Sequence, residues 1–362
     1  MLALNDGALN RSRMLNASDK EILMKYALSA ARATRWCRTF LAALAVAAVV
    51  AVAPVFAQDA WKPTRPVTFI VPNAAAGTSD RTAREIQRIV QARRFVEVPI
   101  LIVNRSGGSG TIALNQLRAS PGDGHVLLIL TGAMLSAQIA GLTPYGHADF
   151  TPLALMMEEY FGVHVRASSP VRSAIEMLER LKKSPDALTF GTASLSGNNF
   201  TSLATALKKG GVDIKRLKAV SFAGGNEITM ALLGGHIDVI STGLGNMAEH
   251  LQQGKMRTLV ITGSQRMWGP FSDVPTWKEI GINTAASSWR GMMGAKDLTS
   301  AQITYWESVF SRVVQTEEWK QELKENYWVN MYANAAATRR TLDSEYIEIK
   351  QILSDLGMAK VK

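Results

Sequence analysis

Small and hydroxyl-bearing residues gather in three short stretches of the chain, where they could hold an oxyanion such as a carboxylate. Residues 72–80 read Pro-Asn-Ala-Ala-Ala-Gly-Thr-Ser-Asp, residues 104–110 read Asn-Arg-Ser-Gly-Gly-Ser-Gly, and residues 192–199 read Thr-Ala-Ser-Leu-Ser-Gly-Asn-Asn. Each stretch follows a strand-like apolar run and precedes a helical pattern. Free backbone N–H groups and the positive end of the macrodipole favour an anion at a helix N-terminus. The three loops are therefore the candidate binding site.

We expect the ligand to contact residues of these loops, the end of the third strand and two later positions. A simpler interpretation remains open for each loop: a tight turn with Asp80 as a helix cap only, a structural glycine turn, or a polar surface loop with an N-cap Asn. The expected ligand contacts are Pro72, Asn73, Ala75, Ala76, Gly77, Thr78, Asp80, Ser106, Gly107, Gly108, Thr131, Thr192, Ser194, Asn198, Gly224 and Asp238.

The sequence lacks the residue patterns of common catalytic, cofactor and metal sites. It has no Gly-x-Ser-x-Gly elbow and no Cys-x-x-Cys pair, and its glycine turn lacks the Gly-x-Gly-x-x-Gly spacing of a dinucleotide site. The five histidines show no metal-ligand spacing, and most are expected on the surface or in loops. We predict a binding protein with no catalytic residue, cofactor or metal. An exported α/β enzyme, the alternative, would need a nucleophile or metal set that the sequence does not show.

The N-terminal region has the pattern of a secretory signal peptide. Arg32, Arg35 and Arg38 precede an apolar run at residues 40–52, and small residues follow up to Ala57. We predict cleavage after Ala57 and export to the periplasm. A membrane anchor is the alternative, but the apolar run is short for a span of about 20 residues. The start codon is a separate question, because Met24 opens a more ordinary leader.

Cysteine usage and charge narrow the class of protein further. The only cysteine, Cys37, precedes the apolar run, which argues against a lipoprotein and leaves the mature chain without a disulfide. The net charge is +10, and the leader, with seven basic and three acidic residues, contributes +4 of it, so the mature part carries +6. These charges are interspersed and form no basic run, so we predict no nucleic-acid binding.

The remaining chain alternates strands and helices, which predicts α/β structure. Strands are expected at 67–71, 100–103 and 125–130, with helices at 80–93 and 111–119 between them. A second such series begins near residue 160 and ends near 283. A strand at 289–294 then leads back, and three helices are expected at the end of the chain, at 300–313, 317–326 and 341–357.

A chain that builds one α/β unit, then a second, and then returns predicts the two-lobed periplasmic binding protein fold, type II-like. We expect each lobe to be a mostly parallel sheet flanked by helices, with the ligand cleft between the lobes. The crossing strands near 158–168 and 287–295 would form the hinge. The expected domains are a signal peptide region at 1–57, lobe one at 58–160 plus 288–362, and lobe two at 161–287.

Several segments, in order, resemble the tripartite tricarboxylate transporter substrate-binding proteins, also called the Bordetella uptake gene (Bug) family. The resemblance covers nearly all of residues 60–360. The matching segments are the Val-Pro loop at 71–80, the Asn and glycine turn at 104–110, a Pro-Gly-Asp-Gly turn at 121–124, Pro144-Tyr145 with Asp-Phe-Thr-Pro at 149–152, Gly-Thr-Ala at 191–193, Gly-Lys-Met-Arg at 254–257 and Asp-Val-Pro-Thr at 273–276.

This resemblance implies a periplasmic receptor, expected to be a monomer, that binds a small carboxylate and supplies it to the small and large membrane subunits of a transporter. Family members also serve as sensors that present their ligand to a kinase, so sensing is the alternative role. The effector domain of a transcription regulator shares the two-lobed architecture, but the leader and the lack of a DNA-binding helix pair argue against it.

The chain departs from the family pattern mainly in the loops that would face the ligand. Asn73 stands where an aromatic residue commonly follows Val-Pro, and Ala75-Ala76-Gly77 replaces Pro-Gly-Gly. Ser194 and Ser196 stand where the second-lobe loop usually has glycine. These changes predict a more polar pocket than the family's usual one.

Overall fold

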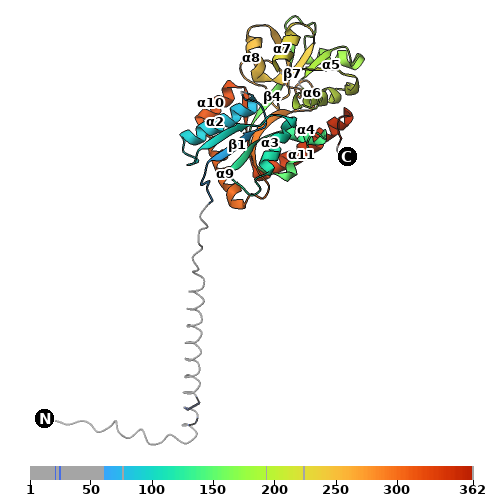
Figure 1. Ribbon diagram of the computed structural model, residues 1–362. Helices are drawn as coiled ribbons and strands as arrows, with labels where there is room; N and C mark the ends of the chain where they lie inside the picture. Colours follow the sequence, from blue (N-terminus) through green and yellow to red (C-terminus); the bar gives the residue numbers. More distant parts are fainter. Residues whose placement is uncertain are drawn as a thin grey trace, which may run out of the picture. The chain divides into compact units, whose positions relative to one another are not determined.

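The structure is a computed structural model that describes residues 61–75, 77–192, 194–222 and 225–360, together with positions 21, 24 and 25. The expected signal peptide and its cleavage position lie outside the described residues. Residues 61–362 form one compact unit, and Figure 1 shows its two α/β lobes. No helix in the described ranges combines the length and the apolar character needed to cross a membrane.

The first lobe is organised around three parallel strands. β1 (Val67–Val71) lies between β2 (Ile100–Asn104) and β3 (Val126–Thr131). Four of the five β1 residues are buried, as expected for a strand covered by helices on both faces. The following helices are α2 (Thr78–Ala92), α3 (Thr111–Arg118), preceded by the short η1 (Gly108–Gly110), and α4 (Ala133–Ile139).

The second lobe repeats this plan. β5 (Thr189–Thr192) lies between β6 (Lys218–Ser221) and β7 (Val239–Gly243), and the three strands are parallel. β8 (Met256–Ile261) also belongs to this lobe and pairs antiparallel with the end of the long strand β4 (Thr151–Arg166). The helices of this lobe are α5 (Ala174–Lys183), α6 (Asn198–Lys209), α7 (Gly225–Leu233) and α8 (Leu244–Gln252).

One long strand, β4 (Thr151–Arg166), runs through both lobes. It pairs antiparallel with β9 (Ser287–Gly294) as far as Tyr160, which lies opposite Ser287. From Phe161 onward it pairs antiparallel with β7, and its last residues also pair with β8. The strand therefore changes partners between Tyr160 and Phe161. The two-lobed α/β fold is confirmed, but the sheet is mixed, because the crossing strands run antiparallel to their neighbours.

The C-terminal segment differs from the three expected helices. α9 (Ser300–Val313) and α10 (Glu317–Glu325) lie close to the expected ranges, but β10 (Trp328–Asn334) is an additional strand, paired antiparallel with β4. The last helix, α11 (Ala335–Asp355), starts six residues earlier than expected. It begins there because the Asn334 side chain accepts a hydrogen bond from the backbone N–H of Ala337 at 3.0 Å, which is an N-cap.

Helix α11 contributes to the cores of both lobes. Leu342 packs in a cluster with strand residues of lobe one such as Leu128 and Leu155. Near the C-terminal end of the helix, Ile352 and Leu353 pack with Phe190 and other residues of lobe two. The Asp355 carboxylate also pairs with Lys208 of α6. The helix therefore connects the two lobes a second time, in addition to the crossing strands.

Candidate functional site

Four loops surround a cavity of about 300 Å³ between the lobes. Three of these loops follow β1, β2 and β3 of lobe one, and the fourth follows β5 of lobe two. The carboxyl ends of parallel strands meet at one edge of each sheet, which is where ligands bind in open α/β sheets. The cavity is lined by Pro72, Asn73, Ala74, Ser106, Gly107, Gly110, Thr131, Ala133, Met134, Ser136, Ala137, Leu142, Ser194, Ser196 and Gly197.

The helices that begin at this cavity have glycine at the N-cap position. Gly77 precedes α2, Gly110 precedes α3 and Gly197 precedes α6, and none of them can cap the helix with a side chain. Gly132 before α4 and Gly243 before α8 are likewise glycine caps, whereas four other helices are capped by side chains: Ser173 for α5, Thr299 for α9, Thr316 for α10 and Asn334 for α11. Glycine caps leave the first-turn N–H groups open to an incoming acceptor.

A hydrogen-bonded clamp fixes the first two loops against each other. The Asn104 side-chain amide donates to the Asn73 carbonyl and to an Asp80 carboxylate oxygen, both at 3.0 Å. The Arg84 guanidinium donates to the other Asp80 oxygen at 2.9 Å. Asp80 is buried, so its carboxylate supports the loop from behind. This role of Asn104 was not predicted from the sequence, where the residue is only the first of the glycine turn at 104–110.

The loop of lobe two is held by its own hydroxyls. The Thr192 hydroxyl donates to the Ser194 carbonyl at 2.9 Å and accepts from the Ser194 N–H at 3.2 Å. The Ser194 and Ser196 hydroxyl oxygens lie 3.2 Å apart. Both serines line the cavity, so the positions where glycine was expected from the family pattern add polar groups to its wall.

The structure brings together six of the expected contact residues at the cavity wall: Pro72, Asn73, Ser106, Gly107, Thr131 and Ser194. Thr192 instead lines an adjoining cavity of lobe two. The side chain of Asn198 lies at the other lobe, where its amide oxygen is 3.5 Å from the Ser136 hydroxyl of α4.

The other expected contacts are placed differently. Ala75, Gly77, Thr78 and Gly108 belong to the same loops but are not among the residues that line the cavity. Asp238 lies at the opposite end of β7, where its carboxylate accepts from the Thr189 N–H at 2.8 Å. This bond joins the starts of two neighbouring strands. Ala76 and Gly224 lie outside the described residues.

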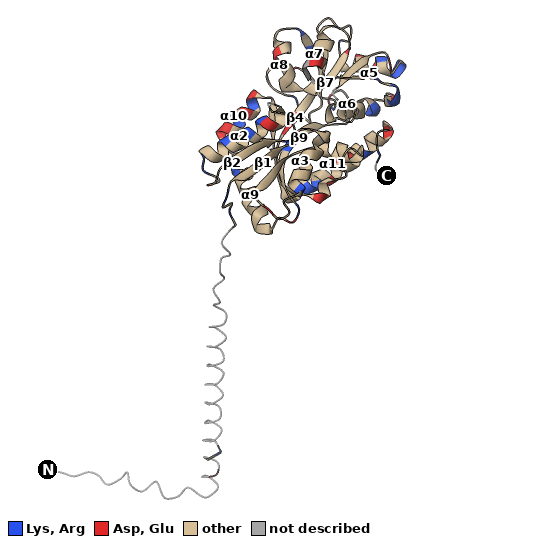
Figure 2. Ribbon diagram, in the orientation of Figure 1, with Lys and Arg blue, Asp and Glu red and all other residues tan. Residues whose placement is uncertain are grey.

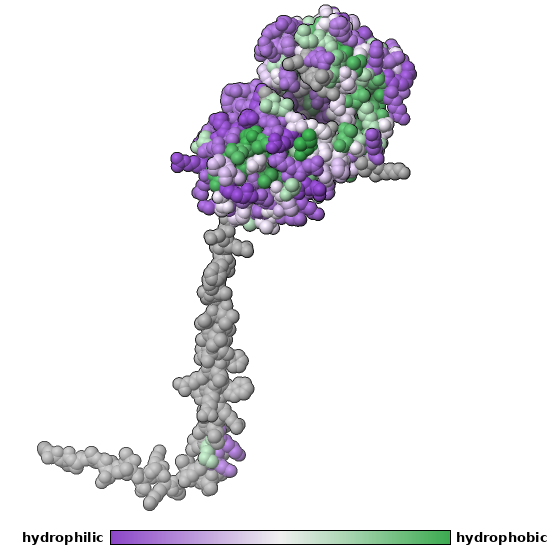
Figure 3. All heavy atoms as spheres, viewed as in Figure 1, coloured by the Kyte–Doolittle hydropathy of each residue, from purple (hydrophilic) through white to green (hydrophobic). Residues whose placement is uncertain are grey.

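Sequence reasoning missed the contribution of α4 to the cavity wall. Ala133, Met134, Ser136 and Ala137 line it, and Leu142, which is 50% exposed, lines it from the turn after the helix. The signal was present, since Thr131-Gly132 ends a buried strand in the same way as the other two loops. Polar residues cover much of the surface seen in Figure 3, with apolar patches on both lobes. The exposed Leu142 gives the cavity an apolar side that suits the carbon chain of a ligand.

Two charged side chains, the buried Glu159 and the half-buried Arg290, lie behind the cavity, on the crossing strands. Arg290 of β9 is the register partner of Thr131. Its guanidinium donates to the Ser79 hydroxyl of α2 at 3.1 Å and to the Ser288 hydroxyl at 2.6 Å. Burial raises the pKa of the Glu159 carboxyl, and the charge of Arg290 opposes that rise. Arg290 therefore places positive charge beneath the N-terminus of α2, balanced by Glu159.

None of the described residues that line the cavity is a histidine. His164 is an exception to the expectation that most histidines lie on the surface or in loops: it is fully buried in β4, where burial lowers its pKa to about 3, so its ring is neutral at neutral pH. Within the part of the chain that the structure describes, no three His, Cys, Asp or Glu side chains are grouped so that they could hold a metal ion.

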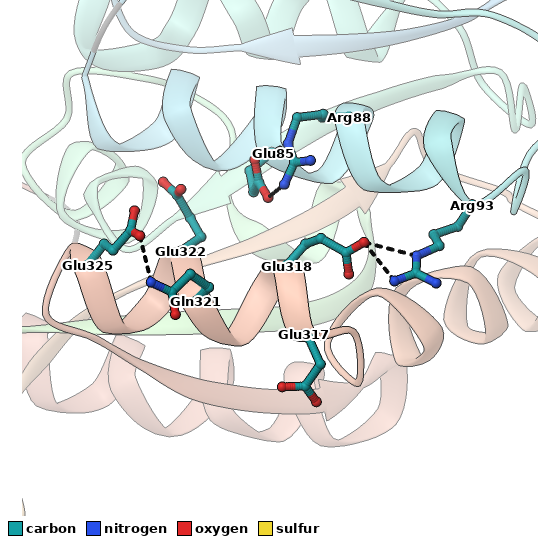
Figure 4. Close-up of a pocket in the computed structure, with 8 residues that line it drawn as sticks. All are labelled: Glu85, Arg88, Arg93, Glu317, Glu318, Gln321, Glu322 and Glu325. Carbon is teal, nitrogen blue, oxygen red and sulfur yellow. Dashed lines mark hydrogen bonds and ion pairs between the residues drawn. The ribbon is translucent and has the colours of Figure 1, made fainter.

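A larger hollow, of about 480 Å³, lies away from the cavity between α2 and α10. Figure 4 shows its lining, in which Arg88 pairs with Glu85 and Arg93 with Glu318. Five glutamates and two arginines line it, and Figure 2 shows charged residues on both helices. Its excess of negative charge would repel an anion, so the interlobe cavity is the candidate ligand site.

Glu345 of α11 lies near the same crossing strands. Both of its carboxylate oxygens accept from the Trp289 indole N–H, each at 2.8 Å. Burial raises the pKa of Glu345 to about 7, with the Trp289 N–H opposing the rise and Glu348 and Glu158 adding to it. The carboxyl therefore takes up a proton near neutral pH when the chain is folded.

The raised pKa of Glu345 predicts that its contribution to the free energy of unfolding falls as the pH rises. Glu345→Gln should remove this pH dependence. The folded pKa, about 7, lies above the ordinary value of 4.5, so the folded state holds the proton more tightly. The contribution of Glu345 to stability is present below pH 4.5 and is lost as the pH rises to 7. Relative to wild type, Glu345→Gln should gain roughly 3 kcal/mol between pH 4.5 and 8 in urea unfolding. Glu249→Gln, at an exposed position of α8, is the control. Parallel curves for Glu345→Gln and wild type would contradict the prediction.

Comparison with known proteins places the fold and the family. The family model of the tripartite tricarboxylate transporter family receptor matches residues 83–358. The UPF0065 protein in the gbd 5' region of Cupriavidus necator is 25% identical over 90% of this chain and 98% of its own length. Protein BugT of Bordetella pertussis is 26% identical over 65% of this chain and 72% of its own.

Three solved structures share the fold. A TctC solute-binding protein from Polaromonas, without ligand, has a TM-score of 0.70 at 24% identity, covering 81% of this chain and 99% of that one. A structure from R. palustris with adipate has a TM-score of 0.69 at 24% identity, covering 82% and 99%. MatC from Rhodopseudomonas palustris with bound malate has a TM-score of 0.66 at 23% identity, covering 80% and 99%.

Proposed function

Since the chain belongs to the tripartite tricarboxylate transporter receptor family, we propose that it captures a small carboxylate in the cavity between its lobes. As a member of this family it is a solute-binding protein and not an enzyme. The proposal adds the ligand class, the place of binding and delivery of the solute to the membrane subunits of a transporter. Two structural relatives contain adipate and malate, and both compounds are small carboxylates.

The glycine N-caps at the cavity are the observation that carries the proposal. A carboxylate that leaves water needs several hydrogen bonds to offset its desolvation. The first turns of α3, α4 and α6, which follow Gly110, Gly132 and Gly197, offer backbone N–H donors. The described residues that line the cavity include no charged side chain, so these donors replace a lining cation. The Ser194 hydroxyl adds a further donor.

A sensing role would use the same site. Transport and presentation of a ligand to a signalling partner both begin with capture in the cavity, so the geometry favours neither. A pair of transporter genes beside this one would favour uptake. Transport is the proposal because the family is defined by receptors of a transporter.

A panel of carboxylates tests the ligand class. Adipate, malate, 4-hydroxybutanoate and 6-hydroxyhexanoate are compared with neutral amides of the same chain length in a thermal-shift assay. A carboxylate present at 100 times its Kd should stabilise the folded state by about 2.7 kcal/mol, which raises Tm by roughly 5 °C or more. The amides should leave Tm unchanged. Equal shifts from acids and amides, or no shift from any acid, would contradict the proposal.

We propose that residues 58–160 plus 288–362 form one lobe and residues 161–287 the other. The change of strand partners between Tyr160 and Phe161 and the start of β9 at Ser287 support these boundaries. The two lobes would close on the ligand about these crossing strands, as hinged binding proteins do. The protein would act as a monomer, because each chain has its own cavity.

Gly132 lies where the lobes approach each other, and it tests closure. It has an ordinary helical backbone, but a Cβ added there would lie 2.5 Å from the amide nitrogen of Asn198 in lobe two. Gly132→Ala should displace only this side chain and weaken carboxylate binding a few-fold. Gly132→Val should hold the lobes apart and weaken binding by about tenfold or more. Calorimetric titration measures the affinity, and small-angle scattering measures the compaction. Ala301→Val, at an exposed position of α9, is the control, and wild-type binding by Gly132→Val would contradict closure at this contact.

We propose that the chain is exported and that the mature protein begins at Gln58. The basic residues before the apolar run at 40–52 and the small residues up to Ala57 support cleavage there. The intact mass of the protein from the periplasmic fraction should correspond to residues 58–362. A membrane-bound species that retains residues 32–57 would contradict this prediction.

A further inference from the structure

A second cavity, of about 260 Å³, lies within lobe two and adjoins the interlobe cavity. The two cavities share Ser194 and Gly197 in their walls. The second one, which we call the lobe-two pocket, extends between α6, α7 and the ends of β5 and β7. Its remaining lining residues are Thr192, Asn199, Ile228, Thr229, Ile240, Ser241 and Thr242. A ligand held at the shared residues can therefore extend into this pocket.

Ser241 points to a polar ligand group in the lobe-two pocket. It is only 8% exposed, and its hydroxyl oxygen has no hydrogen-bond partner among the described residues. A buried hydroxyl without a partner costs free energy, and each one in a folded protein calls for an explanation. The strand that carries it is fixed, because the Asn199 amide donates to the Ser241 carbonyl at 3.2 Å. Ser241 therefore lies at a defined position in the pocket wall and carries a buried hydroxyl without a partner in the described structure.

The charge of the pocket selects the kind of polar group. Among the described residues that line it there is no Asp, Glu, Lys or Arg. A second carboxylate would need several donors of its own here, and the first turn of α6 is already assigned to the first carboxylate, whereas a hydroxyl exchanges one hydrogen bond for another. Ile228 and Ile240 add apolar contact for a short carbon chain.

We infer that the lobe-two pocket takes the uncharged, hydroxyl-bearing end of the ligand, so the preferred ligand is a hydroxy-monocarboxylate and not a dicarboxylate. This inference rests on the proposed function, because the carboxylate end is placed in the interlobe cavity. The hydroxyls of Ser241 and Thr242 recognise the far end. Specificity arises because a polar group of the site stays unpaired when the ligand lacks its counterpart.

Two matched sets of probes test the inference by calorimetric titration. One set is butanoate, 4-hydroxybutanoate and succinate, and the other is hexanoate, 6-hydroxyhexanoate and adipate. In wild type, the hydroxy acid of at least one set should bind about fivefold or more tightly than both its alkanoate and its dicarboxylate. Ser241→Ala, and separately Thr242→Val, should remove most of the preference over the alkanoate and leave the alkanoate affinity unchanged.

Controls separate this inference from the proposed function. Ser354→Ala, at an exposed position of α11, should keep the wild-type preference, and the Tm of each variant reports whether it folds. Ser241→Ala should fold, since its hydroxyl makes no bond within the described structure. Tighter binding of the dicarboxylate in both sets, or an unchanged preference in both pocket variants, would overturn the inference alone. No binding by any of the six acids would overturn the proposed function and this inference with it.

Discussion

In the proposed function, a carboxylate leaves water in a cavity whose described lining has no cation, and this constraint shapes the site. Backbone N–H groups satisfy this constraint only where several helices begin at one place, and the parallel strands of each lobe bring their carboxyl ends to such an edge. Glycine at the caps of α3, α4 and α6 leaves their first turns without a side-chain cap. The clamp of Asn104 on Asp80 and on the carbonyl of Asn73 holds the donors of lobe one in position. The polar loops of the cavity thus depend on a rigid arrangement of strands behind them.

Closure of such a cavity is limited by what connects the lobes. β4 and β9 cross between them, and α11 places Leu342 in the core of lobe one and Leu353 in the core of lobe two. A helix packed in both cores restricts the lobes to small rotations, since larger ones would expose buried apolar surface. The Asn198 side chain of lobe two lies 3.5 Å from the Ser136 hydroxyl of lobe one. This short distance between the lobes fits a closing rotation of small extent.

Much of this architecture could be predicted from the sequence, because buried strands and their glycine-rich loops leave local signals. The three loops and six of their cavity-lining residues follow from strand ends alone. The strand at 328–334 was missed because it is an edge strand with only Trp328 fully buried, so it shows no apolar run. Asp238 was misplaced because the sequence does not say which end of a strand faces the ligand. The contact of Asn198 with the other lobe, and the role of α4, depend on tertiary approach.

The position of the charged side chains behind the cavity explains why the cavity itself can stay neutral. Arg290 lies beneath α2 and is balanced by Glu159, and Glu345 holds the Trp289 indole nearby. A cation in the cavity wall would bind many anions strongly and would have to be neutralised when the cavity is empty. A cation one layer behind adds a positive field while its own hydrogen bonds remain satisfied by Ser79 and Ser288. The wall can then discriminate by hydrogen-bond geometry and shape, because the charge that attracts the ligand and the groups that recognise it are separate.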